Sequence, residues 1–215
     1  MQIHNRIITS NFDQTAIPVE FLVIHYSACS RERIKETFED PRKEVSAHLV
    51  IDEDGTIDEV VACLEWVAYK AWHAGRSEYE REHHKRTEFN EFSIGIELIN
   101  RNGNLFAYTE EQYTSLIAII KKLQILYPAL RLPERIVGHE HIAWYRGKVD
   151  PGVFFDREQV MQSVFPWTPH IPQSIVSTSL REIFDHFKRV ETATDSVRHA
   201  VSYAMEQYQK HIKTL

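Results

Sequence analysis

The chain has 215 residues, of which 43% are hydrophobic and 26% are charged, as is usual for a globular protein. This length suits one domain with an appendage or two small domains, and it can bury a core without a disulfide or a metal. The formal net charge of −6 argues against a broad surface that tracks nucleic-acid phosphates.

The N-terminal residues and the cysteines bear on location. The first six residues lack the unbroken apolar stretch of a secretory signal, and no later segment approaches the length of a membrane span. Cys29 and Cys63 could form only one bridge, and in a reducing compartment both should be free thiols. We therefore expect a cytoplasmic protein with neither a membrane nor a nucleic acid as its partner.

The first part of the chain predicts short strands and one helix. Phe21–Tyr26 has the continuous apolar character of a buried strand. The polar stretch Arg31–Glu39 is a candidate helix that Pro41 would stop. Residues 45–51 and 56–61 predict a pair of strands joined by an Asp-Gly turn.

The middle of the chain predicts a loop, a strand and a long helix. Residues 77–91 are crowded with charge and show almost no apolar periodicity, which favours a solvated loop. Residues 92–99 predict a further strand, of near-continuous apolar character. Thr109 begins a segment with capping-box spacing and helical periodicity that Pro128 closes, and residues 135–137 predict a short strand.

These elements divide the chain into two predicted parts. Strands mixed with one long helix indicate an α/β domain over residues 15–167. After that the composition changes, and two apolar stripes at helical spacing predict a C-terminal helical extension over residues 174–215. The stripes would pack against the α/β domain or against each other, and a dimer contact or a cell-wall-anchoring element is the alternative.

Twelve histidines against seven glycines prompt a search for a metal site. His25 ends a predicted buried strand, at the edge where open α/β sheets gather functional side chains. By the alternation of a strand it shares a face with Phe21 and Val23. A structural histidine bonded to a loop carbonyl is the alternative.

Glu97 interrupts an apolar strand. Ile94, Ile96 and Leu98 occupy one face of that strand, and Glu97 lies on the other, beside Gly95. A carboxylate buried without a partner is costly, so Glu97 needs a cation, a metal-bound water or a raised pKa. An ion pair with an arginine of a neighbouring element is the alternative.

A second group of candidates lies between residues 139 and 150. Pro151 biases Asp150 toward extended backbone, which would project Lys148 and Asp150 to the same side. Two neutral imidazoles and one carboxylate form a three-ligand zinc set with a fourth position for water, from which a nearby glutamate can take a proton. The alternatives are a polar surface loop for His139 and His141, and an ordinary ion pair for Lys148 and Asp150.

Six sequence blocks, taken together, carry a family resemblance. They are Val-Ile-His-Tyr-Ser-Ala at 23–28, Val-Ser-Ala-His at 45–48, Ala-Trp-His-Ala-Gly at 71–75, Phe-Ser-Ile-Gly-Ile-Glu-Leu at 92–98, Gly-His at 138–139 and Lys-Val-Asp-Pro-Gly at 148–152. In this order they resemble the zinc-dependent N-acetylmuramoyl-L-alanine amidases of the type 2 family. That family includes cytoplasmic recycling enzymes, phage lytic enzymes and peptidoglycan recognition proteins, and the resemblance covers residues 20–157.

The resemblance implies an α/β fold with a central mixed β-sheet flanked by helices and one Zn²⁺ ion in a surface groove. Carried over by position, His25, His139 and Asp150 resemble the zinc ligands. Glu97 resembles the residue that handles the proton of the water, and Lys148 resembles the residue that stabilises the oxyanion. The implied reaction is hydrolysis of the amide between N-acetylmuramic acid and L-alanine.

The resemblance also suggests substrate-binding residues. The expected set is Trp72, His73, His48 and Arg86. Trp72 and His73 belong to the block near the groove, and His48 could equally have a structural role. Arg86 falls in the charged segment where recycling enzymes place arginines that hold substrate carboxylates, and Arg81 and Lys85 are further candidates there.

The chain departs from the family pattern after the matched Gly-His pair. The recycling enzymes tend to continue with an acidic residue, Ile-Ala and a proline. Here His141 occupies the acidic position and the aromatic pair Trp144-Tyr145 replaces the proline. His141 is the rival zinc ligand, and His139 is preferred because it directly follows the matched glycine.

Three functions compete. The first is a cytoplasmic zinc amidase that acts on muropeptides in cell-wall recycling. The second is a phage-type or exported lytic amidase that acts on intact wall, for which the C-terminal extension would be a candidate anchor. The third is a non-catalytic peptidoglycan-binding module, which the complete set of five ligand and catalytic residues disfavours.

Overall fold

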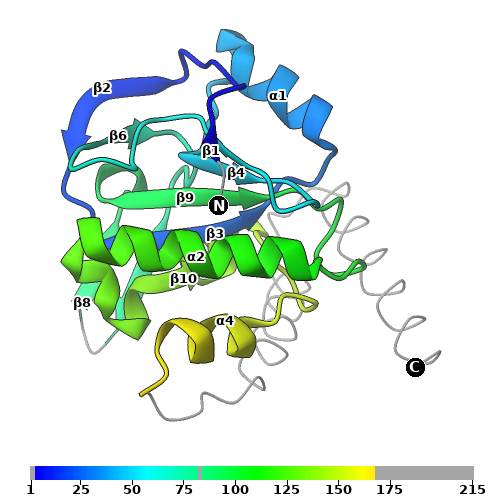
Figure 1. The fold of residues 1–215 in the computed structure, drawn as a ribbon. Coiled ribbons are helices and arrows are strands. Elements are labelled where there is room, and N and C mark those ends of the chain that lie inside the picture. The colour runs from blue at the N-terminus through cyan, green and yellow to red at the C-terminus, as the bar shows by residue number, and fades with distance from the viewer. Residues whose placement is uncertain (1–2, 82–83, 168–215) are drawn as a thin grey trace, which may run out of the picture.

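The structure is a computed structural model, and it describes residues 3–81 and 84–167. A six-stranded sheet of order β1-β5-β4-β9-β3-β10 forms its centre (Figure 1). The six strands are β1 (Ile3–His4), β3 (Phe21–Tyr26), β4 (Leu49–Ile51), β5 (Ile57–Glu59), β9 (Ser93–Leu98) and β10 (Ile136–Gly138). The neighbours β4, β9, β3 and β10 are parallel, whereas β5 is antiparallel to β4. The sheet is therefore mixed, as expected.

Helices flank both faces of this sheet. They are α1 (Arg31–Glu39), α2 (Glu110–Leu126), α3 (His139–Ala143) and α4 (Arg157–Val164). Apolar residues of β3 and β9 such as Leu22 and Ile96 belong to the same core as Leu116 and Ile120 of α2, which crosses in front of the sheet in Figure 1. Phe38 of α1 packs in a separate core on the opposite face.

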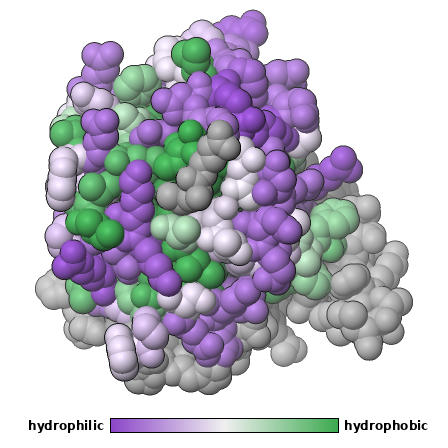
Figure 2. Space-filling view, in the orientation of Figure 1, coloured by the Kyte–Doolittle hydropathy of each residue, from purple (hydrophilic) through white to green (hydrophobic). Residues whose placement is uncertain are grey.

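Local sequence signals explain where the main helices begin. The Thr109 hydroxyl accepts the Gln112 N–H and the Gln112 side chain accepts the Thr109 N–H, which is the predicted capping box at the start of α2. The Ser30 side chain caps α1, which spans the predicted Arg31–Glu39. The outer face over α2 shows hydrophilic residues lying between hydrophobic ones (Figure 2), as expected where a helix meets solvent.

Two sequence expectations are corrected. The charged segment 77–91 is not a loop throughout, because it contains the antiparallel hairpin β7 (Glu78–Arg81) and β8 (His84–Thr87). Its charged side chains form ion pairs across the hairpin and with neighbouring elements, and Tyr79 packs against the core. Because charged residues line the hairpin, its sequence lacks the apolar alternation by which a strand is predicted. The strand expected over 45–51 is shorter, because the Ser46 N–H donates to Trp72 instead of to a neighbouring sheet strand.

A second antiparallel pair, β2 (Phe12–Ile17) with β6 (Ala68–Ala71), lies beside the sheet. None of the helices in the described ranges has the length and apolar character needed to span a bilayer. The predicted C-terminal extension, 174–215, lies outside the described residues.

Candidate metal centre

Three parallel strands bring the candidate residues to one edge of the sheet. His25 on β3 is the register partner of Glu97 on β9, so their side chains share a face. On the other side of β3, Gly138 of β10 pairs with Ile24, and the next residue is His139 at the start of α3. This is the carboxyl edge of the strands, where open α/β sheets place functional groups.

Asp150 reaches the same point from a loop that is held at several atoms. Its carbonyl accepts the Glu140 N–H at 3.0 Å. The Tyr108 hydroxyl donates to the carbonyl of the next residue, Pro151, at 2.6 Å. Gly103 lies so close that a Cβ there would be 2.0 Å from that carbonyl. The loop therefore has little freedom to move Asp150 away.

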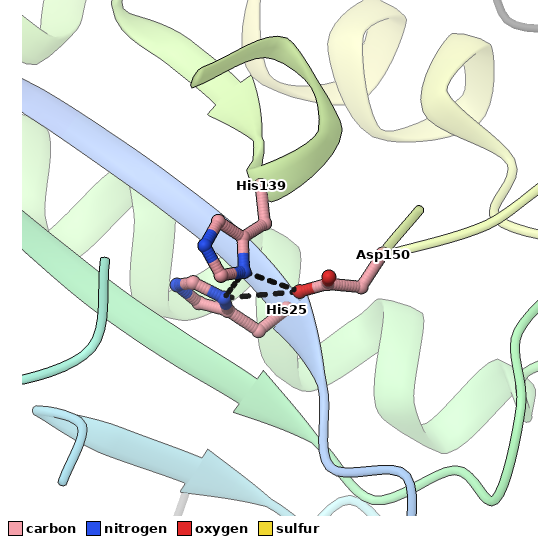
Figure 3. Close-up of side chains that lie close together, drawn as sticks. All are labelled: His25, His139 and Asp150. Carbon is pink, nitrogen blue, oxygen red and sulfur yellow. Dashed lines mark hydrogen bonds and ion pairs between the residues drawn. The ribbon is translucent and has the colours of Figure 1, made fainter. Parts of the chain in front are cut away.

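The side chains of His25, His139 and Asp150 converge on one point (Figure 3). The two Nδ1 atoms are 3.0 Å apart, and each lies 3.0 Å from Oδ2 of Asp150. All three residues are buried. Three donors at this spacing can all lie about 2 Å from a single point, the bond length that Zn²⁺ takes with nitrogen and oxygen.

Hydrogen bonds at the ring nitrogens that point away from this triangle of donors decide which nitrogen of each histidine carries the hydrogen. Nε2 of His139 is 3.2 Å from the Ala74 carbonyl, which can only accept, so Nδ1 of the neutral ring presents its lone pair. Nε2 of His73 is 3.3 Å from the Ser93 carbonyl, so His73 has its lone pair on Nδ1. That lone pair accepts from Nε2 of His25 at 3.0 Å, which leaves Nδ1 of His25 unprotonated as well.

The charges at this cluster agree with a cation-binding site. Burial and the neighbouring His139 lower the pKa of His25 to about 4, so its ring is neutral at pH 7. Burial alone would raise the pKa of Asp150, but His139 and His25 bring it well below its ordinary value, so the carboxylate is ionised. A buried carboxylate beside two imidazole nitrogens needs a cation between them, either a proton or a metal ion, and this donor set fits zinc.

Glu97 and Lys148 line the same cavity of about 360 Å³ as the three donors. Burial and the charge of Asp150 raise the pKa of Glu97 to about 8, although Lys148 opposes the shift. One Glu97 oxygen, Oε2, is buried without a hydrogen-bond partner in the described part of the chain. A carboxyl group with a pKa near neutrality can both accept and return a proton.

The expected substrate-binding residues lie in different surroundings. His73 lines the cavity but is only 7% exposed, and its Nδ1 lies 3.0 Å from Nε2 of His25, the ring nitrogen that points away from Asp150. Trp72 donates its N–H to the Ser46 hydroxyl and its indole N–H to Asp13 of β2, so its ring lies against the β2–β6 pair.

His48 and Arg86, which were also expected to bind substrate, have partners within the chain. His48 is fully buried, accepts the Gly95 N–H and donates to the Tyr69 carbonyl, and these contacts favour the structural role. Arg86 pairs with Glu20 at 2.7 Å and stacks over Phe92, the residues that precede β3 and β9. It therefore lies at the end of these strands opposite to the donors. A charged segment without apolar periodicity does not reveal which edge of the sheet its side chains reach.

His141 and Lys85 also have partners away from the donors. Nδ1 of His141 accepts the Gly138 N–H at 2.9 Å, so it is bonded to backbone and is not part of the triangle. Lys85 pairs with Glu78 across the β7–β8 hairpin at 2.7 Å. The side chain of Arg81 is outside the described part of the chain.

Sequence reasoning missed Asn90. Its side-chain oxygen accepts the His73 N–H at 3.1 Å and the Ala74 N–H at 2.8 Å, directly behind His25 and His139. Asn90 lies in the charged segment expected to be a solvated loop. Asparagine often bonds to backbone in this way, but no spacing pattern in the sequence indicates its partner.

Comparison with known proteins identifies the family. The family model described as N-acetylmuramoyl-L-alanine amidase matches residues 15–153, well over half of the chain. The chain belongs to this amidase family. The amidase is 34% identical over 179 residues to 1,6-anhydro-N-acetylmuramyl-L-alanine amidase AmpD of Haemophilus influenzae, a match that covers 74% of this chain and 91% of that relative.

Solved structures agree with the family. A selenomethionine derivative of AmpD is 30% identical, with a TM-score of 0.61 over 75% of this amidase and 94% of that chain. The amidase AmiD from E. coli is 27% identical, with a TM-score of 0.59 over 91% of this amidase and 82% of that chain. AmiD was solved with its substrate anhydro-N-acetylmuramic acid-L-Ala-D-γ-Glu-L-Lys. The mixed sheet flanked by helices is therefore the fold of this family.

Proposed function

We propose that this amidase is a zinc enzyme that hydrolyses the amide between the lactyl group of anhydro-N-acetylmuramic acid and L-alanine in soluble muropeptides. The observation that carries the proposal is the buried triangle of His25, His139 and Asp150, with Glu97 and Lys148 on the wall of the same cavity. The names of the relatives support the substrate class, because AmpD is named for the 1,6-anhydro sugar and AmiD was solved with an anhydromuropeptide.

The residues of the chain divide the chemistry between them. Zinc held by the three donors would polarise the amide carbonyl and make a bound water acidic. Glu97 would accept one proton from the attacking water and pass it to the leaving nitrogen of L-alanine. The ammonium group of Lys148 would stabilise the negative charge that develops on the carbonyl oxygen. The products are the free sugar carboxylate and the free amine of the peptide.

We further propose that the enzyme works in the cytoplasm, in cell-wall recycling. Cys29 and Cys63 are both free thiols in the structure, which suits a reducing compartment. A small muropeptide would bind at the cavity of about 360 Å³, which lies between the sheet edge and α1 residues such as Ile34 and Phe38.

The test is mass spectrometry of the products from two substrates, each with zinc and with a chelator. One substrate is an anhydromuramoyl tripeptide and the other is intact peptidoglycan. We expect chelator-sensitive release of free peptide from the small substrate and none from intact wall. Release from intact wall would assign the protein to the lytic class. No release from either substrate by a protein with zinc bound would favour a binding module and contradict the proposal.

A further inference from the structure

Two consecutive residues contact both ligand histidines from behind. Nε2 of His25 donates to Nδ1 of His73 at 3.0 Å. Nε2 of His139 donates to the carbonyl of Ala74 at 3.2 Å. Both acceptors belong to the segment between β6 and β7, which is remote in sequence from either ligand. One short segment therefore faces the non-ligating nitrogen of each histidine.

This segment is itself held by its neighbours. His73 donates from Nε2 to the Ser93 carbonyl at the start of β9. Asn90 accepts the N–H groups of His73 and Ala74. Arg146 donates to the Ala74 carbonyl at 2.9 Å. The position of the segment is thus determined from β9 and from the turn after α3.

The β9 backbone also approaches the His73 ring closely. A Cβ on Gly95 would lie 2.4 Å from Cγ of His73, so only glycine fits at that position without a shift of the ring. His73 is 7% exposed and each of its ring nitrogens already has a partner. It has no free donor or acceptor for a substrate, which disagrees with the substrate-binding role expected from the sequence.

Outer hydrogen bonds to ligand histidines matter because they select the nitrogen that is free to bind metal. A ligand imidazole donates its other N–H to a carboxylate, a carbonyl or a water, and this fixes both the tautomer and the plane of the ring. At His139 the acceptor is the Ala74 carbonyl, whereas at His25 it is the lone pair of His73, a second imidazole.

We propose that His73 is a positioning residue, which holds His25 in the tautomer and orientation that present Nδ1 to zinc, and that Asn90 keeps His73 and Ala74 in place for both ligands. The inference rests on the proposed function in one respect, that His25 and His139 hold the metal. It adds a specific acceptor, Nδ1 of His73, whose loss weakens metal binding although His73 does not touch the metal.

The test compares two variants with the wild type. His73→Asn keeps an oxygen near the position of Nδ1, whereas His73→Leu has a similar size and no acceptor. Zinc affinity is measured by competition with a chelator, and the unfolding temperature is measured on the metal-free proteins. We expect His73→Leu to bind zinc roughly 10- to 100-fold more weakly. We expect His73→Asn to stay within a few-fold of the wild type.

A general packing defect would behave differently. Because it does not depend on an acceptor, it would lower the zinc affinity of both variants together with their metal-free unfolding temperatures. Wild-type affinity in His73→Leu, or an equal loss in His73→Asn, would overturn the inference. A wild-type protein that binds no zinc would contradict the proposed function itself, so the two failures are distinct.

Asn90 offers a second test with less risk to folding, because its side chain is only partly buried. Asn90→Asp keeps the oxygen that accepts both N–H groups, whereas Asn90→Ala removes it. We expect Asn90→Ala to weaken zinc binding and Asn90→Asp to retain it. Equal affinity in these two variants would contradict the role of Asn90 in holding the segment.

Discussion

Glu97 lies beside His25 in the register of β9 and β3 but contributes no atom to the triangle of donors. Glu97 lines the cavity and its buried oxygen Oε2 has no hydrogen-bond partner, so an ion pair with an arginine has no support among the described contacts. Burial raises its pKa to about 8. These properties suit a residue that exchanges a proton with the substrate water.

The substitution Glu97→Gln tests this role, because it keeps the shape of the side chain and removes its basicity. We expect kcat to fall by about 10²- to 10⁴-fold, the usual contribution of a general acid–base residue. Zinc content should remain at the wild-type level, since Glu97 is not a donor to the cluster. The measurements are kcat on the anhydromuramoyl tripeptide and zinc by atomic absorption. Wild-type turnover in this variant would rule out the assigned proton transfer.

Asp150 supplies the only carboxylate of the triangle. We expect Asp150→Ala to weaken zinc binding by more than the roughly 10- to 100-fold that loss of a supporting residue costs. Zinc affinity by chelator competition is the measurement. Asp156→Ala is the matched control, because Asp156 caps α4 and lies outside the triangle. Full zinc occupancy in Asp150→Ala at low free zinc would show that the third ligand is misassigned.

At the scale of elements, an ion-pair network joins α1 to the sheet. Asp58 of β5 is fully buried and accepts from Arg6 at 2.9 Å and from Arg31, at the start of α1, at 2.5 Å. Arg31 also contacts Asp52 in the turn between β4 and β5, at 2.7 Å. Since Ile34 and Phe38 of α1 line the cavity, this network helps to place one of its walls.

The stability contributed by Asp58 should depend on pH. Burial alone would raise the pKa of Asp58, but hydrogen bonds from Arg6 and the charge of Arg31 bring it below its ordinary value. A lowered folded-state pKa stabilises the fold at pH values above the ordinary pKa of about 4, and this contribution is lost as pH falls through the folded-state pKa.

We therefore expect Asp58→Asn to lower the free energy of unfolding by about 3 kcal/mol at pH 7, because two guanidinium groups lose their charged partner. The difference from the wild type should shrink as pH falls below about 4. Urea unfolding at several pH values measures it. A difference that stays constant down to pH 2 would mean that the charge of Asp58 does not stabilise the fold.

At the scale of the whole molecule, every residue assigned to the site lies between positions 25 and 150. Among the described residues, the cores that support them extend to Phe165. The two-part division of the chain at residues 15–167 and 174–215 remains a prediction. If that division is right, a protein ending at residue 167 should contain all that metal binding requires.

We expect the protein of residues 1–167 to bind zinc with wild-type affinity and to cleave the anhydromuramoyl tripeptide at a similar rate. Chelator competition and product mass spectrometry on both lengths of the chain test this. A shortened protein that unfolds cooperatively but no longer binds zinc would show that the C-terminal part contributes to the site, which would contradict the proposed division.

Much of the fold could be predicted from local patterns. Phe21–Tyr26 and the capped helix α2 follow from apolar runs and from Thr109, because these signals act between residues close in sequence. The β7–β8 hairpin was missed, because its stability depends on Tyr79 packing against a core that the local sequence does not reveal. The order of the strands in the sheet could likewise not be predicted from residue patterns alone.

For the site, the sequence by itself determined the types and rough places of the residues. His25 and Glu97 were conspicuous because a polar group in an apolar strand needs a partner. Only the tertiary structure decided which atoms meet: that Nδ1 of His25 faces Asp150, that His73 lies behind His25, and that Arg86 is at the other end of the strands. Hydrogen bonds act over about 3 Å, and the separation of residues along a chain does not determine distances on that scale until the sheet register is set.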